Sequence, residues 1–213
     1  MKVFRAEGLQ EEGYDEIVTL LRSGGVIAFP TDTAYGLGAN PFANAAVDRI
    51  FEVKGRPENK PILLLVDSVA MAESVAKPAD DFYKLVQQFW PGPLTVILPA
   101  AKSVPLELTA GTRTVGVRWP MADFATNLVK RFGQPITATS ANQSGLPAAI
   151  TAAEVREQLD DRIDALVDGG RLPSRVGSTV IDLTAAPPVL LREGLVSFET
   201  LQRSFDGRIR RKA

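Results

Sequence analysis

The stretch 25–66 constrains the fold of this 213-residue chain more than any other part of it. An apolar run at 25–29 predicts a buried strand, and Pro30 ends its hydrogen-bonding ladder. A polar turn with the sequence PTDTAYGLG comes next, followed by a helix at 44–53, a loop with three cations and a strand at 62–66. This order predicts a cleft with hydroxyl groups on one wall and positive charge on the other, which suits a small polar ligand joined to phosphate.

Strands and helices alternate along the rest of the chain. Apolar alternation and short apolar runs predict strands at 2–5, 94–98, 114–118, 135–139, 163–167, 177–183 and 189–192. Helical spacing of apolar residues predicts helices at 11–23, 70–75, 79–89, 122–132, 151–159 and 198–205. We therefore expect one α/β domain over 1–205, with a twisted, mixed parallel and antiparallel sheet flanked by helices, and a basic tail over 206–213.

Composition excludes several kinds of chemistry. The chain contains no cysteine and no histidine, which rules out disulfides, thiolate nucleophiles, Ser-His-Asp triads and histidine-ligated zinc. The formal net charge is -1, so overall charge gives no argument for nucleic acid or an anionic membrane. Any chemistry must use carboxylates, hydroxyls, cations, oxygen-bound metal or groups of the substrate itself.

The sequence shows no targeting or membrane segment. Its first twenty residues lack a basic start followed by an apolar core, so no signal peptide is predicted. No apolar run approaches the roughly 20 residues that cross a bilayer. We expect a cytoplasmic protein with no membrane partner.

Cations at strand ends are the strongest physical signal for a site. Lys54, Arg56, Lys60, Arg118 and Arg192 each lie at the end of a predicted strand or in a loop beside one. Ligand sites in α/β sheets gather at strand ends, and several cations around one cavity bind a phosphate chain. The alternative for each is a surface cation with a carboxylate neighbour. Neither a P-loop nor a GxGxxG fingerprint is present.

Several polar turns leave two interpretations open. The loop SANQSG after the strand at 135–139 can form an anion-binding nest or be an ordinary turn, and the same holds for 177–179. Thr31 and Thr33 can cap the following segment or contact a ligand. Asp32 alone is a weak metal-ligand candidate. Trp90, within WPGP, is expected to serve packing rather than base stacking.

Seven motifs together resemble one family. The segments are PTDTAYGLG, KGRPENKP, WPGPLT, TAGTRTVGVR, TSANQSG, VGSTV and VLLREG, and they run collinearly over 24–194. They resemble the YrdC-like threonylcarbamoyl-AMP synthases. The paired KxR and SxN patterns, here Lys54-Gly55-Arg56 and Ser140-Ala141-Asn142, are the most specific marks. Because the chain ends soon after Arg192, the resemblance implies the short, single-domain type.

The resemblance implies that L-threonine, bicarbonate and ATP, with Mg²⁺, form threonylcarbamoyl-AMP and pyrophosphate. The product serves modification of the adenosine beside the tRNA anticodon by separate transferase proteins. By the same resemblance, threonine is held by Thr33, Arg118, Ala138 and Ser178. ATP is contacted by Arg56, Lys60, Thr114, Ser140 and Arg192. The expected catalytic residues are Lys54, Arg56, Ser140 and Asn142.

This sequence departs from the family pattern at Leu65, where relatives can carry histidine, so any polar contact made there is absent or replaced. Two rival functions remain open. One is an RNA-binding module that grips phosphates with a concave basic surface, with weak RNA binding helped by the basic tail. The other is a regulatory domain that binds a nucleotide or amino acid without turnover.

Overall fold

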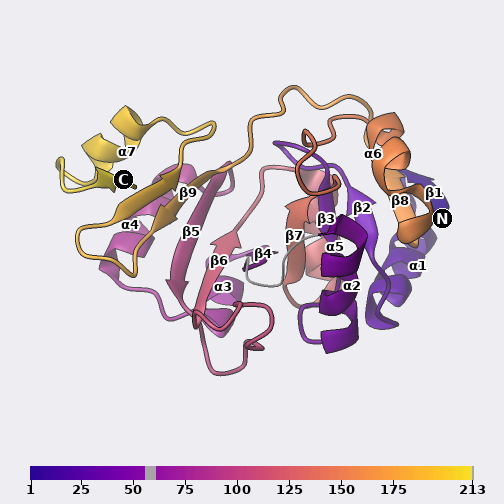
Figure 1. The fold of residues 1–213 in the computed structure, drawn as a ribbon, viewed down its shortest axis with the longest axis horizontal. Helices are drawn as coiled ribbons and strands as arrows, with labels where there is room; N and C mark the ends of the chain where they lie inside the picture. Colours follow the sequence, from indigo (N-terminus) through magenta and orange to yellow (C-terminus); the bar gives the residue numbers. More distant parts are fainter. Residues whose placement is uncertain (56–60, 213) are drawn as a thin grey trace.

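Apolar alternation builds one broad, twisted sheet, which Figure 1 shows with helices packed around it. The computed structural model describes residues 1–55 and 61–212. The strands are β1 (Lys2–Arg5), β2 (Ile27–Phe29), β3 (Gly36–Gly38), β4 (Leu63–Leu65), β5 (Leu94–Pro99), β6 (Thr114–Arg118), β7 (Ile136–Ser140), β8 (Ala165–Asp168), β9 (Thr179–Asp182), β10 (Val189–Arg192) and β11 (Arg210–Arg211). The helices are α1 (Glu11–Arg22), α2 (Asn44–Lys54), α3 (Val69–Val75), α4 (Asp80–Phe89), α5 (Asp123–Phe132), α6 (Ala152–Leu159), the 3₁₀ turn Asp160–Arg162 and α7 (Phe198–Ser204).

The predicted mixed sheet is confirmed. The strands of the described residues follow the order β1-β8-β2-β3-β7-β4-β6-β5-β9-β10-β11. The pairs β1–β8, β2–β8, β4–β6, β5–β9 and β10–β11 are parallel. The remaining neighbours are antiparallel. Such a mixture needs both hairpins and helical crossovers, which is the alternation that the sequence contains.

Each central strand sends alternate side chains into two different cores. In β2, Ile27 and Phe29 pack with α1 and α5, whereas Ala28 packs with α2 and α6. In β4, Leu64 and Leu65 divide in the same way. The sheet is therefore covered on both faces near β2. This explains why β2 is apolar at all of its positions instead of alternating between apolar and polar residues.

One interpretation of the sequence was wrong: the predicted polar turn does not extend through Gly38. Gly36–Gly38 forms β3, which pairs antiparallel with both β2 and β7 in the interior of the sheet. A Cβ on Gly38 would lie 2.7 Å from Phe29 Cε1, 2.8 Å from Ile136 Cγ2 and 2.9 Å from the Thr137 carbonyl oxygen. The glycine that suggested a turn is instead required by close packing within the sheet.

The expected basic tail lies partly in regular structure. Arg210 and Arg211 form β11 beside β10, and Arg211 forms ion pairs with Glu193 and Glu199. Arg208 pairs with Asp81 at 3.7 Å. The division of the chain at residue 205 remains a prediction. No helix among the described residues is both long enough and apolar enough to cross a membrane.

Residues 169–178 join β8 to β9 by crossing the width of the sheet (Figure 1). β8 is second in the strand order and β9 is ninth, so their separation along a flat sheet is about 34 Å. Eleven Cα–Cα steps reach at most about 36–40 Å. This length is enough to cross the sheet, and the segment contains no helix.

Replacing Gly38 with alanine tests the close packing of β3. We expect Gly38→Ala to lower the free energy of unfolding by about 1–3 kcal/mol, because the added methyl group overlaps backbone as well as side chains. Gly36→Ala is the matched control, since its Cβ would meet only side-chain atoms of Phe29 and Thr31 at 3.3–3.4 Å. Urea denaturation of both variants measures the difference. An equal loss in the two would contradict this account of β3.

Candidate active site

The cavity that contains most of the predicted site residues lies over β4, β5, β6, β7 and β9. Its volume is about 390 Å³. Its floor consists of residues two apart on neighbouring strands, which therefore share a face. They are Leu63 and Leu65 of β4, Gly116 and Arg118 of β6, Ala138 and Ser140 of β7, Thr95 and Ile97 of β5, and Val180 of β9. The walls come from the Thr31–Gly36 segment and from the end of the 169–178 segment.

Arg118 is fixed at one side of this cavity by three residues from two segments, the turn at Gly92 and the PTDT turn. Its Nε donates to the Gly92 carbonyl at 3.1 Å, its Nη1 to Thr33 Oγ1 at 3.1 Å and its Nη2 to Asp32 Oδ1 at 2.5 Å. Only 5% of the residue is exposed. Burial lowers the pKa of Arg118, while the Asp32 carboxylate acts in the opposite direction. Arginine remains charged despite such burial, so Arg118 is an immobilised cation.

Asp32 is the counter-ion of Arg118, and only one of its two carboxylate oxygens accepts a hydrogen bond from the described residues. Its Oδ1 accepts from Arg118, whereas its Oδ2 is buried and has no hydrogen-bond partner among the described residues. A buried carboxylate oxygen without a donor is costly, and such atoms are often found at functional sites. Arg118 lines the cavity, whereas Asp32 is not among the lining residues.

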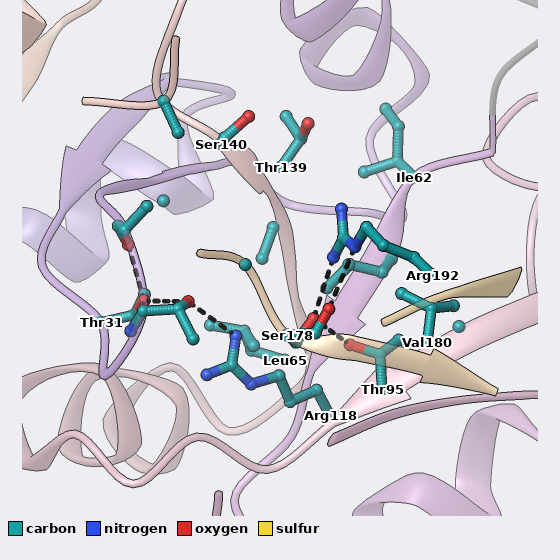
Figure 2. Close-up of a pocket in the computed structure, with 18 of the residues that line it drawn as sticks. Thr31, Ile62, Leu65, Thr95, Arg118, Thr139, Ser140, Ser178, Val180 and Arg192 are labelled. Carbon is teal, nitrogen blue, oxygen red and sulfur yellow. Dashed lines mark hydrogen bonds between the residues drawn. The ribbon is translucent and has the colours of Figure 1, made fainter. Parts of the chain in front are cut away.

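The two threonines of the PTDT turn have different tasks. Thr31 Oγ1 donates to the Ala34 carbonyl at 2.6 Å and accepts from the Thr33 amide at 3.1 Å, as in a side-chain-supported turn. Thr33 Oγ1 instead accepts from Arg118. Figure 2 shows the chain of hydrogen bonds from Thr31 through Thr33 to Arg118. The turn is therefore built by Thr31, and Thr33 faces the cavity cation.

A second cation, Arg192 at the end of β10, is held by Ser178, which directly precedes β9. Arg192 donates through Nε to the Ser178 carbonyl at 3.0 Å and through Nη2 to Ser178 Oγ at 3.1 Å. Ser178 Oγ also lies 2.8 Å from Thr95 Oγ1 (Figure 2). Arg192 remains exposed to solvent as a residue, yet the protein around its guanidinium and, secondarily, the charge of Arg118 lower its pKa. Two like charges thus face one cavity.

Lys54 and Asn142 stabilise the loop that follows β7, outside the cavity lining. Lys54 is 3% exposed, and its Nζ donates to the carbonyls of Ser140 and, at 2.8 Å, of Asn142. The Asn142 amide donates to the carbonyls of Gln143 and Leu146, both at 2.8 Å. Neither side chain is among the residues lining the cavity. These contacts indicate how the two residues shape the loop; their expected catalytic role stays a prediction.

The structure brings most of the predicted site residues to one cavity. Its lining includes Thr33, Arg118, Ala138, Ser140, Ser178 and Arg192. Thr114 is not among the lining residues; its hydroxyl lies 2.9 Å from that of Thr112. Arg56 and Lys60 lie outside the described residues. Leu65 is 1% exposed and lines the floor, so the position contributes apolar surface here.

Sequence reasoning missed several lining residues, among them Thr95, Ile97, Val180 and Arg175. Thr95, Ile97 and Val180 could have been found only from the register of β5 and β9, because their face depends on pairing between distant segments. The expected packing role of Trp90 is confirmed. Its Nε1 donates to the Leu94 carbonyl at 2.7 Å, and its ring packs edge-on against Phe82.

The buried ion pair between Asp32 and Arg118 predicts a large effect on stability. We expect Asp32→Ala to lower the free energy of unfolding by about 3 kcal/mol, because the remaining guanidinium stays buried without its counter-ion. Thermal and urea unfolding provide the measurement. Glu11→Ala is the control, since it breaks an ion pair with Arg131 at the surface and should have little effect. Similar losses in both variants would contradict the role of burial.

Comparisons with known proteins agree with this geometry. The Sua5_yciO_yrdC family model, described as "Telomere recombination", matches residues 19–194. Threonylcarbamoyl-AMP synthase of Pyrococcus abyssi is 44% identical over 184 residues, covering 86% of this chain and 54% of the relative. That of Bacillus subtilis is 41% identical over 189 residues, covering 88% and 55%. This chain therefore spans about half the length of these two relatives.

A solved structure described as P. abyssi Sua5 complexed with L-threonine superposes with a TM-score of 0.93 and 41% identity. The alignment covers 99% of this chain and 62% of that one. The similarity of the seven motifs is thus accompanied by similarity of the whole fold. The match to the family model over most of the sequence confirms the resemblance, and the chain belongs to the Sua5–YciO–YrdC family.

Proposed function

We propose that the chain is a threonylcarbamoyl-AMP synthase, an enzyme that joins L-threonine, bicarbonate and ATP to give threonylcarbamoyl-AMP and pyrophosphate. The observation that carries this proposal is the convergence of Arg118 and Arg192 on one cavity. Their mutual repulsion is relieved when anionic groups occupy the space between them. The names of the P. abyssi and B. subtilis relatives support the same activity.

An amino acid matches the charge at the Arg118 side of the cavity. Threonine carries a carboxylate, and Arg118 offers a fixed cation among the residues that line the cavity. Thr33 adds a hydroxyl, while Ala138 and Leu65 provide apolar floor for a methyl group. The L-threonine complex of the P. abyssi relative supports threonine as the ligand. Ser178 links this region to Arg192 and the nucleotide.

The proposed reaction needs no histidine. The neutral threonine amine adds to the carbon of bicarbonate. One amine proton and the hydroxyl group of bicarbonate leave together as water, which gives an N-carboxylate. One oxygen of this carboxylate attacks the α-phosphorus of ATP, and the bond from that phosphorus to the bridging oxygen breaks to release pyrophosphate. The nucleophile is already an anion. Catalysis therefore depends on positioning the anions and on cations that stabilise the charge developing on phosphate oxygens.

Arg192 suits the phosphate side of this reaction. It is exposed within the cavity, and Ser178 fixes its guanidinium through two hydrogen bonds. By family resemblance, Arg56, Lys60, Thr114 and Ser140 also contact ATP. We propose that Lys54 and Asn142 act by holding the Ser140 loop in place, through the contacts described above.

Mg²⁺ enters in this proposal with ATP as part of the substrate. Phosphate oxygens and water would supply ligands to the ion, as is usual for Mg²⁺ bound with a nucleotide. The described residues contain no group of three or more acidic side chains that could form a protein cage for it. When bound, the ion offsets negative charge on the phosphates. We further propose that separate transferase proteins consume the adenylate and carry the threonylcarbamoyl group to tRNA.

Mass spectrometry of the reaction mixture tests the proposed function. Purified protein with Mg²⁺ and all three substrates should form threonylcarbamoyl-AMP and release an equal amount of pyrophosphate. Omitting threonine, bicarbonate or ATP in turn should abolish both products. If ATP binds but no pyrophosphate appears with both co-substrates present, the chain is a binding domain without turnover and the proposal fails.

Substituting Arg192 tests its assignment to the phosphate side. We expect Arg192→Met to lower kcat/KM for ATP by about 10²- to 10³-fold, because a positioned charge is lost in the transition state. L-threonine binding, measured by calorimetry, should remain near that of the wild type. Arg22→Met removes an exposed arginine at the end of α1 and serves as the control. Adenylate formation at the wild-type rate in Arg192→Met would exclude Arg192 from the mechanism.

A further inference from the structure

Arg175 is a cavity-lining arginine that the activity proposed above does not use. It lies near the end of the 169–178 segment and is two residues from Gly177, which also lines the cavity. Its guanidinium donates through Nη1 to Glu154 Oε2 at 2.8 Å and to the Ala148 carbonyl at 2.7 Å. Its Nη2 donates to Glu154 Oε1 at 2.6 Å. The side chain is nevertheless 45% exposed.

Glu154 is held as firmly as the arginine that it binds. It lies in the first turn of α6, where its Oε2 accepts from the Ile150 amide at 2.9 Å and its own amide donates to Thr151 Oγ1 at 3.2 Å. The N-cap contact is that of a capping box, except that the carboxylate accepts from the residue before the N-cap; together the two hydrogen bonds fix Glu154 relative to the helix. The Arg175 guanidinium and the Ile150 amide lower the pKa of Glu154 to about 2, so the carboxylate is ionised at neutral pH. Arg175 is thus an arginine whose charge is already neutralised.

The position of this pair separates it from Arg118. Ala148 belongs to the loop that follows Ser140, and Arg175 is bonded to that loop. In Figure 2, Ser140 and Thr139 lie across the cavity from Arg118. The Arg175 wall therefore adjoins the Ser140 side, while the amino-acid side is at Arg118. The substrate that spans the cavity would extend from Arg118 toward this wall.

Two parts of ATP extend from the reacting phosphorus: the nucleoside and the pyrophosphate. Pyrophosphate needs cations whose charge is not already offset, and the Glu154 carboxylate beside Arg175 would repel it. A nucleoside is uncharged and needs a flat surface with weak polarity. Three of the five N–H groups of Arg175 are used by Glu154 and Ala148, which fixes the guanidinium plane. A fixed guanidinium plane is a good stacking surface for a base.

We propose that Arg175 packs against the base of the nucleotide and contributes to selection of a nucleoside triphosphate, and that Glu154 is the positioning residue that orients it. The inference rests on the proposed function for the direction in which ATP lies. It adds a specificity-determining contact to the proposed phosphate contacts. The hydrogen bonds of Arg175 to Glu154 and to the Ala148 carbonyl keep this contact in place.

Calorimetry with two probes separates base binding from phosphate binding. AMP carries the base, and inorganic tripolyphosphate carries only the anion. Arg175→Met should weaken AMP binding by about 5- to 30-fold and leave tripolyphosphate binding unchanged. Arg175→Lys should not restore AMP binding, because lysine keeps the charge but lacks the plane. Arg171→Met, an exposed arginine of the same segment that does not line the cavity, should behave as wild type with both probes.

Glu154→Gln gives a result that a merely structural role would not produce. It removes the repelling charge and loosens Arg175, so AMP should bind several-fold more weakly while tripolyphosphate binds more tightly. In turnover assays, Arg175→Met should raise KM for ATP with little change in kcat or in KM for threonine. Thermal unfolding establishes that each variant is folded. If Arg175→Met is not folded, Arg175→Lys is used in its place for the two binding measurements.

Three results would overturn the inference. They are equal weakening of both probes by Arg175→Met, no effect on AMP binding, and full rescue by lysine. Failure of the proposed function is distinguishable from these. If wild-type protein binds AMP through Arg175 but forms no threonylcarbamoyl-AMP, the base contact stands and the synthase activity does not.

Discussion

The buried guanidinium of Arg118 is the interaction on which the rest of the site depends. It connects three segments that are far apart in sequence: β6, the turn at Gly92 and the PTDT turn with Asp32 and Thr33. Each of these contacts satisfies a polar group that would be costly to bury alone. The same contacts hold the positive group at a fixed place beside the cavity. Stability of the fold and arrangement of the site therefore share one set of hydrogen bonds.

The three arginines of the cavity differ in how their charge is balanced. Arg118 is paired with Asp32 within the protein, Arg192 is held by the uncharged Ser178, and Arg175 is neutralised by Glu154. Only Arg192 of these three has no carboxylate partner among the described residues. A polyanion is consequently drawn toward Arg192.

The sequence predicted the fold class and most strands because apolar periodicity is a local property. It could not predict that Gly36–Gly38 is a strand, since glycine is required there only by Phe29 and Ile136 packing across the sheet. The site was predicted through the resemblance of motifs, and four residues that it named, Thr33, Arg118, Ser178 and Arg192, line one cavity. Thr95, Val180 and Arg175 were missed, because their place in the lining follows from strand register and from the path of the 169–178 segment.

A crystal structure with L-threonine and an unreactive ATP analogue would test the central claim most directly. The claim is that an amino acid and a nucleotide meet in the single cavity between Arg118 and Arg192. The account predicts density for the threonine carboxylate within hydrogen-bonding distance of Arg118, and for the α-phosphate on the Arg192–Ser178 side. Threonine bound away from Arg118, or the two ligands in separate cavities, would contradict it.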